Sequence, residues 1–491
     1  MQRRASDVKR RAVSDPAVVR RHDPVHAATV LFAVVLAVYM ANGRTIWSWD
    51  TPAARYLPIA ILRHGTFYLD EFPALYAGHP QWERAILRPI GGHYVSFYPV
   101  GAPLVAAPFY APAVLHGLSR VDAQAEALEK ISAAAIVSLS VAFLYLALLH
   151  LTSRGVALGL ATAYVFGTSS FSVSSQALWQ HGPSQLGLAI TLFLFARDRS
   201  AADRWFGLAG FPLAMAVVCR PSDLFLAAPL GLYALWARPR RAPWLVASAL
   251  PPVLFQLWYN VTYLGDPFWQ QFPMSNGFYW QSASWKRAAS MLFSPSRGLF
   301  VYSPIFLFSV VGLVVAWRKG GDPLLRAAGI GVLLMLAIYS KWRLWWAGTT
   351  YGPRYLADLS PLLIVALVPI VRSVMERRVW RTVFAVALAW SIVVHGAGAF
   401  YDDGRYSTAT LWSWTDNQLV RALGRLLHVA SPSAAHRSPG VGEVAQRHGR
   451  LFDLGMPELF PLERDEPAVT ELAERREGFA QRYRAAAGED G

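Results

Sequence analysis

The sequence has only one cysteine, Cys219, among its 491 residues. A single thiol excludes an intrachain disulfide framework and any metal motif that requires two cysteines. The fold must therefore form without covalent cross-links within the chain.

Charged residues are also scarce, at 16% of the sequence, whereas soluble domains contain about a quarter. Hydrophobic residues make up 54%, the mean hydropathy is +0.30, and there are 19 tryptophans. This composition is atypical of a soluble domain. It predicts an all-α polytopic integral membrane protein.

Acidic residues are few compared with basic ones, 31 against 46, which gives a formal charge of +15. The basic residues lie mainly in short connections between apolar runs, where they orient helices, so we expect no nucleic-acid partner. Residues 1–27 form a basic tail without a small-residue cleavage site after it. We therefore expect a retained first span at residues 28–46 and a cytoplasmic N-terminus.

Long apolar runs occupy most of the chain. A helix takes roughly 20 apolar residues to cross a bilayer core. On that template the sequence predicts about eleven transmembrane helices, at residues 28–46, 131–151, 155–173, 183–198, 204–219, 222–238, 243–263, 299–317, 324–341, 355–373 and 380–400.

The connections between these spans differ in composition on the two sides. Alternate connections, such as ARDRSAADR, WARPRR and RSVMERRVWR, are rich in arginine, which is typical of cytoplasmic loops. The intervening connections are rich in Trp, Tyr, Gly and Pro. We expect these to lie with Asp50 on the outer face.

Residues 43–130 form a large first outer loop in this scheme. Within it, residues 98–118 are apolar and long enough to cross the membrane, but a crossing there would place the arginine-rich loops outside. Four prolines also argue against a regular helix. We expect this segment to lie in the interface or to re-enter, in a loop that carries short surface helices.

Residues 401–491 differ from the transmembrane domain at residues 28–400. They contain eleven Lys/Arg against fourteen Asp/Glu and no apolar run of membrane length. We expect a separate extracytoplasmic tail that ends in a solvated helix and a disordered terminus, from Glu463 onward.

The stretch IWSWDTPAARYLP places Asp50 just beyond the first apolar run, with tryptophans before it. One interpretation is that Asp50 caps a surface helix that starts at Pro52. The other is that a carboxylate at the bilayer surface serves as a base or as a cation ligand. The sequence leaves both open.

Other polar residues gather in the predicted outer loops. Arg220 lies in a very short turn, where either Asp223 or an anionic headgroup could pair with it. Arg354 follows a Gly-Pro turn, and a planar guanidinium such as that of Arg354 or Arg297 suits bidentate contact with phosphate. The candidate substrate-binding residues are Arg55, Tyr56, Tyr98, His181, Arg220, Arg297, Tyr351 and Arg354.

Asp70 and Glu71 are adjacent carboxylates in the first outer loop. Neighbouring acids in a loop are usually solvated. A divalent cation bound between them is the alternative, and it is the only cofactor that the sequence raises.

Six stretches, in their order and sidedness, resemble the multi-pass glycosyltransferases of the GT-C superfamily. They are SWDTPAARY, YPVGAPLVAAPFY, WQHGPS, CRPSD, SPSRGLFVYSP and YGPRYL, spread over about residues 28 to 360. The similarity is greatest to bacterial members like dolichyl-phosphate-mannose protein mannosyltransferases and lipid A aminoarabinose transferases. The tail from Tyr401 has no part in it.

This resemblance implies a sugar donor linked to a polyprenyl phosphate and transfer on the periplasmic or lumenal face. For this chain we expect the bacterial inner membrane. The acceptor would be a lipid, a glycan or a protein. Asp50 is the acid that matches the family's position after the first span. The protein-mannosyltransferase branch often has an Asp-Glu pair there, whereas this chain has Thr51 after Asp50.

The implied chemistry fits the residue types. A carboxylate at Asp50 could take the proton of an acceptor hydroxyl as that hydroxyl attacks the anomeric carbon, which predicts inversion. Polyprenyl phosphate leaves as an anion, so no second carboxylic acid is required, unlike in glycosidases. Arg220, Arg297 and Arg354 would stabilise charge on the phosphate, and Tyr98, His181 and Tyr351 would orient donor or acceptor.

Two other classes of function compete with an enzyme. A transporter or flippase of lipid-linked glycans would also gather arginines and aromatics, but it usually has access from both faces and broken or repeated spans. A noncatalytic membrane scaffold would pair its outer charges internally.

Overall fold

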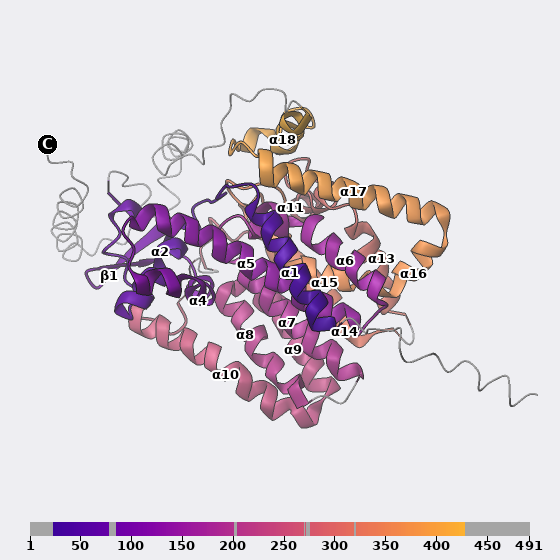
Figure 1. Cartoon of the computed structure of the whole chain (residues 1–491), viewed down its shortest axis with the longest axis horizontal. Coiled ribbons are helices and arrows are strands. Elements are labelled where there is room, and N and C mark those ends of the chain that lie inside the picture. The colour runs from indigo at the N-terminus through magenta and orange to yellow at the C-terminus, as the bar shows by residue number, and fades with distance from the viewer. Residues whose placement is uncertain are drawn as a thin grey trace, which may run out of the picture.

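The computed structural model describes residues 23–77, 85–200, 204–269, 271, 275–318 and 321–427. Most of these residues are helical, and the helices pack into a bundle with a smaller subdomain at one end (Figure 1). Most of the predicted basic tail at residues 1–27 and the helix predicted from Glu463 lie outside the described residues.

Three of the described helices are long and apolar enough to cross a membrane, and a bent pair could make a fourth span. The three are α5 (Val121–Leu149), α14 (Pro323–Ser340) and α17 (Arg378–Tyr401). The bent pair runs from Arg354 to Val365 and from Val368 to Glu376, with a 65° bend. The predicted count of about eleven crossings is therefore not confirmed, although the mainly helical fold is.

The other predicted spans are also occupied by helices, most of them shorter than predicted. They are α1 (Pro24–Met40), α6 (Arg154–Phe166), α7 (His181–Ser200), α8 (Gly210–Cys219), α9 (Leu224–Ala237), α10 (Ala242–Tyr259), α12 (Leu299–Tyr302), α13 (Phe306–Ala316), α15 (Ser360–Val365) and α16 (Val368–Glu376). Short turns of 3₁₀-helix lie at residues 204–209, 221–223, 239–241, 354–359 and 408–410, and π-helical turns at residues 170–174 and 260–264.

Local sequence accounts for where two of these helices begin. The side chain of Asp23 accepts a hydrogen bond from the amide of Val25, and α1 starts with a proline. Asp322 caps α14 in the same way, again before a proline. An acceptor at the N-cap followed by proline in the first turn satisfies the free amides of a helix start.

Small residues allow close contact between the helices of the bundle. A Cβ atom at Gly210 of α8 would clash with the carbonyl oxygen of Leu245 in α10, and one at Gly312 of α13 would clash with that of Ala366. Apolar surface packs no better against protein than against lipid tails, so close backbone approach of this kind supplies much of helix association in membranes.

One end of the bundle gathers the polar contacts between helices, and we call it the site end. It holds the C-terminal ends of α1, α8 and α14 and the N-terminal ends of α7 and α9. Lys130 of α5 donates to the side chain of Gln176, and the amide of Ile46 donates to the Gln176 carbonyl. The connections α7–α8, α9–α10, α13–α14 and α16–α17 lie at the opposite end.

Exposed tryptophans occur at both ends of the bundle. Trp205, Trp236, Trp244, Trp317 and Trp380 lie at the opposite end, Trp258, Trp285, Trp412 and Trp414 lie toward the site end, and Trp390 lies within α17. Indole rings concentrate at the two membrane–water interfaces, where one edge of the ring is apolar and the N–H is hydrated. This arrangement supports the membrane assignment independently of hydropathy.

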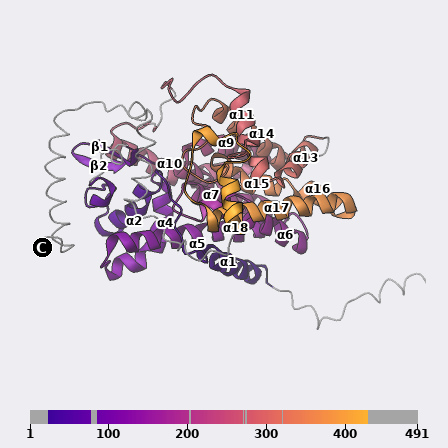
Figure 2. The same ribbon diagram turned by 90° about the horizontal axis from the view of Figure 1, so that it is seen from above.

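The first loop folds into a subdomain of its own, seen at one side in Figures 1 and 2 with α16 at the other. It contains α2 (Pro52–His64), a 3₁₀ turn (Pro73–Leu75), α4 (Gly101–His116) and an antiparallel hairpin of β1 (Leu87–Ile90) and β2 (His93–Ser96). The loop thus contains helices, as expected, and their place at a membrane surface stays a prediction. The hairpin has no counterpart among the predictions.

The expectation that residues 98–118 would not form a regular helix is wrong. Residues 101–116 form the continuous helix α4 despite prolines at 103, 108 and 112. Pro103 lies in the first turn, where its missing N–H costs nothing, and Pro108 and Pro112 each remove one backbone hydrogen bond. The following helix, α5, begins at Val121 rather than near residue 131.

Two buried polar contacts join the subdomain to α5. Arg55 Nε lies 2.6 Å from Glu129 Oε2, and the Tyr56 hydroxyl donates to Asp122 Oδ1 at 2.8 Å. The Arg55 and Glu129 side chains are 3% and 0% exposed. Burial alone would lower the pKa of Arg55, but the Glu129 carboxylate raises it above its usual range. Arg55 is therefore a cation held by α5.

The C-terminal part of the described chain packs back on the bundle. Residues 402–427, which we call the strap, end in α18 (Gln418–Leu427), beside α17 in Figure 1. Leu419 and Ala422 of α18 join a core cluster with Tyr302 and Tyr351. The strap is thus part of the folded body, whereas the sequence predicted a separate tail from residue 401.

We predict that Arg55→Met lowers the free energy of unfolding by about 3–5 kcal/mol, because it leaves the Glu129 carboxylate buried without its cation. The double variant Arg55→Met/Glu129→Gln should lose much less, since no unpaired charge remains. Unfolding in detergent followed by tryptophan fluorescence measures both. Equal stability of Arg55→Met and the wild-type protein would contradict the prediction.

Candidate functional site

An ion pair between Asp50 and Arg354 lies at the centre of the site end. Arg354 Nη1 is 2.9 Å from Asp50 Oδ2, although the two residues are 304 positions apart in sequence. The Asp50 side chain is 19% exposed and that of Arg354 is 7% exposed. Among the described residues, none donates a hydrogen bond to Asp50 Oδ1. One carboxylate oxygen therefore remains available to a ligand.

Local sequence fixes the position of each partner. Asp50 lies between α1 and α2. Thr51 is the N-cap residue of α2, without a capping hydrogen bond from its side chain, and the Asp50 carboxylate bonds to Arg354 instead. The capping interpretation of Asp50 therefore fails. Arg354 follows the Gly-Pro turn that the sequence predicted to fix its direction, and Gly352 has a φ of 65°, a conformation that favours glycine.

Arg354 is also stacked on an indole. Its Cζ atom lies 4.9 Å from the centre of the Trp179 ring, and its Nε atom is buried without a hydrogen-bond partner among the described residues. The Trp179 N–H donates to the carbonyl of Ile46 at 3.2 Å. Trp179 thus supports Arg354 and fixes the segment that leads to Asp50.

Arg297 reaches the same region from the segment before α12. Its Nη2 atom donates to the carbonyl of Gly348 at 2.9 Å, and the residue is 4% exposed. Its Nε and Nη1 atoms are buried without partners in the described chain. Burial lowers the pKa of Arg297 to about 10, so it is still a cation at neutral pH.

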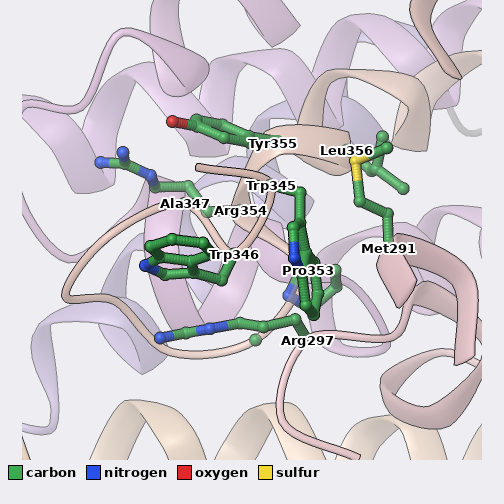
Figure 3. A pocket seen from close by; sticks show the side chains of 10 residues that line it. Met291, Arg297, Trp345, Trp346, Ala347, Pro353, Arg354, Tyr355 and Leu356 are labelled. Atoms are coloured by element: carbon green, nitrogen blue, oxygen red, sulfur yellow. The ribbon is translucent and has the colours of Figure 1, made fainter. Parts of the chain in front are cut away.

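A pocket of about 180 Å³, including its open mouth, lies between these two arginines. Figure 3 shows Arg354 and Arg297 extending in the same direction, with the ring of Trp346 between them. The pocket is lined by Met291, Arg297, Trp345, Trp346, Ala347, Gly352, Pro353, Arg354, Tyr355 and Leu356. We call it the arginine pocket.

The strap holds the segment that carries Arg297. Ser296 Oγ donates to the carbonyl of Thr410 at 3.0 Å, and Gln418 donates to the carbonyl of Ser296 at 2.6 Å. The guanidinium of Arg297 lies over the ring of Tyr406, 5.3 Å from its centre. The position of Arg297 thus depends on residues that the sequence assigned to a tail.

A second, fully buried polar cluster lies behind Arg354. His181 Nδ1 is 2.9 Å from Asp358 Oδ2, and the same oxygen accepts a hydrogen bond from Arg220. Arg220 Nη1 is 3.8 Å from Asp223, which also accepts from Ser184. Arg220 therefore has an internal carboxylate partner, as the structural interpretation of this arginine required, but that partner is mainly Asp358.

Tyr98 lies beside the central ion pair. Burial and the nearby carboxylate of Asp50 raise the pKa of its hydroxyl well above the ordinary value, while Arg354 lowers it. Arg88 lies over the neighbouring Phe97 ring, with 3.8 Å between its Cζ and the ring centre. Tyr98 thus lies near Asp50 and Arg354, and its role in orienting donor or acceptor stays a prediction.

The other predicted residues lie elsewhere or have other contacts. Arg55 and Tyr56 bind α5 carboxylates, as described above, so their substrate-binding role has no support in these contacts. The hydroxyl of Tyr351 donates to the carbonyl of Val394 at 3.0 Å, and its ring packs against Tyr302.

Asp70 and Glu71 do not converge on a common point. Asp70 Oδ2 is 2.7 Å from His93 Nδ1 and its Oδ1 accepts from the amide of Tyr94, whereas Glu71 pairs with His64 at 3.1 Å. No group of three or more His, Cys, Asp or Glu side chains able to hold a metal ion occurs in the part of the chain that the structure describes. The divalent cation therefore has no place in our proposal.

Asp358 and Trp179 are the residues that sequence reasoning missed. Asp358 stands in LADLSPLL, a carboxylate inside a predicted span, which is itself a signal of a functional or paired charge. Trp179 had no comparable signal among 19 tryptophans.

The geometry allows the arginine pocket to bind a phosphate ester. A buried N–H without an acceptor costs about 1–3 kcal/mol, and phosphate oxygens are strong acceptors for guanidinium groups. The free oxygen of Asp50 lies next to this cationic pocket and could accept a proton.

We predict that Tyr406→Ala weakens binding of a short alkyl phosphate roughly 5- to 30-fold, because the cation–π contact that orients Arg297 is worth about 1–2 kcal/mol. Calorimetric titration of the detergent-solubilised protein measures this affinity. Trp414→Ala, an exposed residue of the same strap, serves as the control. An equal loss in both variants would mean that the strap acts only on general stability.

No protein-family model matches this sequence, and no curated protein matches it. Among solved structures, the chain is similar to the Archaeoglobus fulgidus oligosaccharyltransferase tethered to an acceptor peptide that contains the NVT sequon. The TM-score is 0.44 and the sequence identity is 11%, with 78% of this chain and 56% of that chain covered. The match thus takes in little more than half the length of that enzyme.

Proposed function

We propose that this protein is a membrane glycosyltransferase of the GT-C type, which moves a sugar from a polyprenyl-phosphate donor to an acceptor hydroxyl. The observation that carries the proposal is the Asp50–Arg354 ion pair at the mouth of the arginine pocket. It combines a carboxylate with one free oxygen and cationic donors that have no acceptor.

The donor phosphate would occupy the arginine pocket. Arg297 offers two buried nitrogen donors without partners, Nε and Nη1, and Arg354 offers one, Nε. A phosphodiester supplies the acceptors that these groups lack, and two arginines stabilise the additional negative charge that develops as the bond to the sugar breaks. Trp345 and Trp346 line the same pocket and give apolar surface for the first isoprenoid units.

Asp50 would act as the general base. The acceptor oxygen attacks the anomeric carbon, its proton passes to Asp50 Oδ1, and the bond between that carbon and the phosphate oxygen breaks. Polyprenyl phosphate leaves with the electron pair. A single displacement inverts the configuration at the anomeric carbon. The salt bridge to Arg354 orients the carboxylate.

The protein would act at the outer surface of a bacterial inner membrane, with its N-terminus in the cytoplasm. Arginine-rich connections at the opposite end of the bundle support this orientation. The catalytic domain extends over residues 28–400, and the strap contributes through Arg297.

We predict that Asp50→Asn lowers kcat about 10²- to 10⁴-fold, the usual contribution of a positioned base. Binding of the donor should not weaken, because loss of the Asp50 charge leaves Arg354 free to bind phosphate. Release of polyprenyl phosphate from a labelled donor, measured beside a donor-binding titration, separates the two effects.

Asp198→Asn is the matched control for this variant. Asp198 is a buried carboxylate paired with Arg238 at 2.7 Å, at the opposite end of the bundle. Its replacement removes the same charge from a comparable ion pair and should leave turnover unchanged. Full activity in Asp50→Asn would remove Asp50 from the mechanism, and movement of intact donor across the membrane without cleavage would show a flippase instead.

Arg354→Met should, unlike Asp50→Asn, weaken binding of the donor. It removes a donor to the phosphate, so we expect the KM for the donor to rise roughly 10-fold or more, since a hydrogen bond to a charged group contributes about 1.5–3 kcal/mol. Arg372→Met, which removes an exposed arginine of α16, is the control. A donor KM that is the same in both variants would place the phosphate elsewhere.

A further inference from the structure

The 3₁₀ turn at residues 354–359 carries Arg354 at its start and Asp358 four positions later. A turn this short has few hydrogen bonds of its own, so its orientation depends on the elements packed around it. Gln185 of α7 donates to the carbonyl of Ala357 at 2.9 Å. The direction in which Arg354 extends is therefore set partly by α7, which is far from it in sequence.

The segment that leads into α7 contacts this turn at two points. The Cζ atom of Arg354 lies 4.9 Å from the centre of the Trp179 ring, and His181 Nδ1 lies 2.9 Å from Asp358 Oδ2. A single contact would leave the turn free to rotate about it. Two contacts at separate positions fix the rotation as well as the distance, so the bond between His181 and Asp358 constrains where the Arg354 guanidinium points.

The surroundings of Asp358 identify the donor in this hydrogen bond. Asp358 Oδ2 also accepts a hydrogen bond from Arg220, so this oxygen is an acceptor to both neighbours, and the proton lies on His181 Nδ1. The His181 and Asp358 side chains are 4% and 1% exposed, which leaves little room for water to compete. A hydrogen bond to a carboxylate is also stronger than one between neutral groups.

Arg220 supports the same turn from the short connection between α8 and α9. Its Nη1 and Nη2 atoms each lie 3.4 Å from the carbonyl oxygen of Tyr355, the residue after Arg354, and Nη2 donates to the hydroxyl of Tyr339. Replacing this arginine would leave its carboxylate partners buried without their cation. The imidazole of His181 is a better target, because an amide can replace it and keep a hydrogen-bond donor.

We propose that His181 is a positioning residue of this site. Its Nδ1–H holds the Asp358 carboxylate and so directs the Arg354 guanidinium toward Asp50 and the arginine pocket. The inference rests on the proposed function, in which Arg354 binds the donor phosphate. The sequence assigned His181 to the donor or acceptor itself, whereas in this proposal its whole effect on the reaction passes through Arg354.

Two amide substitutions test this role, because they place the same group at different positions. The side-chain NH₂ of Asn takes the place of histidine Nδ1, and that of Gln takes the place of Nε2. In the full-length protein, His181→Asn should keep the wild-type donor KM, and His181→Gln should raise it roughly 3- to 10-fold, the effect of one lost hydrogen bond. Release of polyprenyl phosphate from a labelled donor measures both.

The reverse order would show that Nε2 touches a substrate, and it would overturn the inference. An equal rise of the donor KM in His181→Asn and His181→Gln would assign the effect to packing and overturn it as well.

A double-mutant cycle with Arg354→Met separates positioning from a general structural effect. If His181 acts only through Arg354, His181→Gln should change the donor KM less than about 2-fold once the Arg354 guanidinium is absent, because effects of coupled residues are not additive. A full additional rise in the double variant would show that the two residues act independently, which would overturn the inference.

Binding of a short alkyl phosphate, measured by calorimetry, distinguishes this inference from the proposed reaction. Suppose that the protein never cleaves the donor, but that His181→Gln weakens phosphate binding and has no effect when Arg354→Met is also present. The positioning role would then stand and the glycosyltransferase would be rejected. Donor cleavage with a wild-type donor KM in both amide variants would reject the positioning role alone.

Discussion

The arrangement at the site end depends on one ion pair, between Asp50 and Arg354. The two residues come from segments 304 positions apart, so their contact holds the loop after α1 against the loop after α14. Both side chains are largely shielded from water, where the attraction between opposite charges is stronger than at a surface. The same shielding means that removing one charge would leave the other buried without a partner and destabilise the protein. The pair therefore constrains the fold and holds a carboxylate beside a cationic pocket.

Charge compensation also explains the surroundings of that pair. Arg220 and His181 share the carboxylate of Asp358, and Arg55 is paired with Glu129, so each of these groups has a carboxylate partner within the protein. Arg297 differs, because it has only the Gly348 carbonyl and the Tyr406 ring, and two of its N–H groups have no acceptor in the described chain. Burying N–H groups without acceptors destabilises the fold, so folding alone does not explain an arginine in this position. A ligand with anionic oxygens would accept hydrogen bonds from these groups. This distinguishes Arg297 from the arginines that only hold helices together.

The sequence predicted those parts of the site that local chemistry marks. Asp50 stood out as an acid next to interfacial tryptophans, and Arg354 as a guanidinium directed by a Gly-Pro turn. Their contact with each other, the role of Trp179 and the pairing of Arg220 with Asp358 depend on long-range packing that no local pattern encodes. Arg55 shows the opposite case. Its position in the chain suggested that it belongs to the site, whereas its contacts hold α2 against α5.

In the fold, apolar periodicity located the helices, but α4 formed despite its prolines because the subdomain packs around it. The strap was assigned to a tail because its composition is polar, and its tertiary contacts override that signal.

Trp179 connects the two halves of the central ion pair. The guanidinium of Arg354 lies over its ring, and its N–H donates to the carbonyl of Ile46 in the segment that leads to Asp50. Asp50 Oδ1 accepts no hydrogen bond from the described residues, and the Asp50 side chain is 19% exposed. Asp223 and Asp358 also have an oxygen without a partner, but both residues are completely buried and cannot meet an acceptor from outside. The physical case for a base at Asp50 therefore rests on its partial exposure beside a cationic pocket as much as on the carboxylate itself.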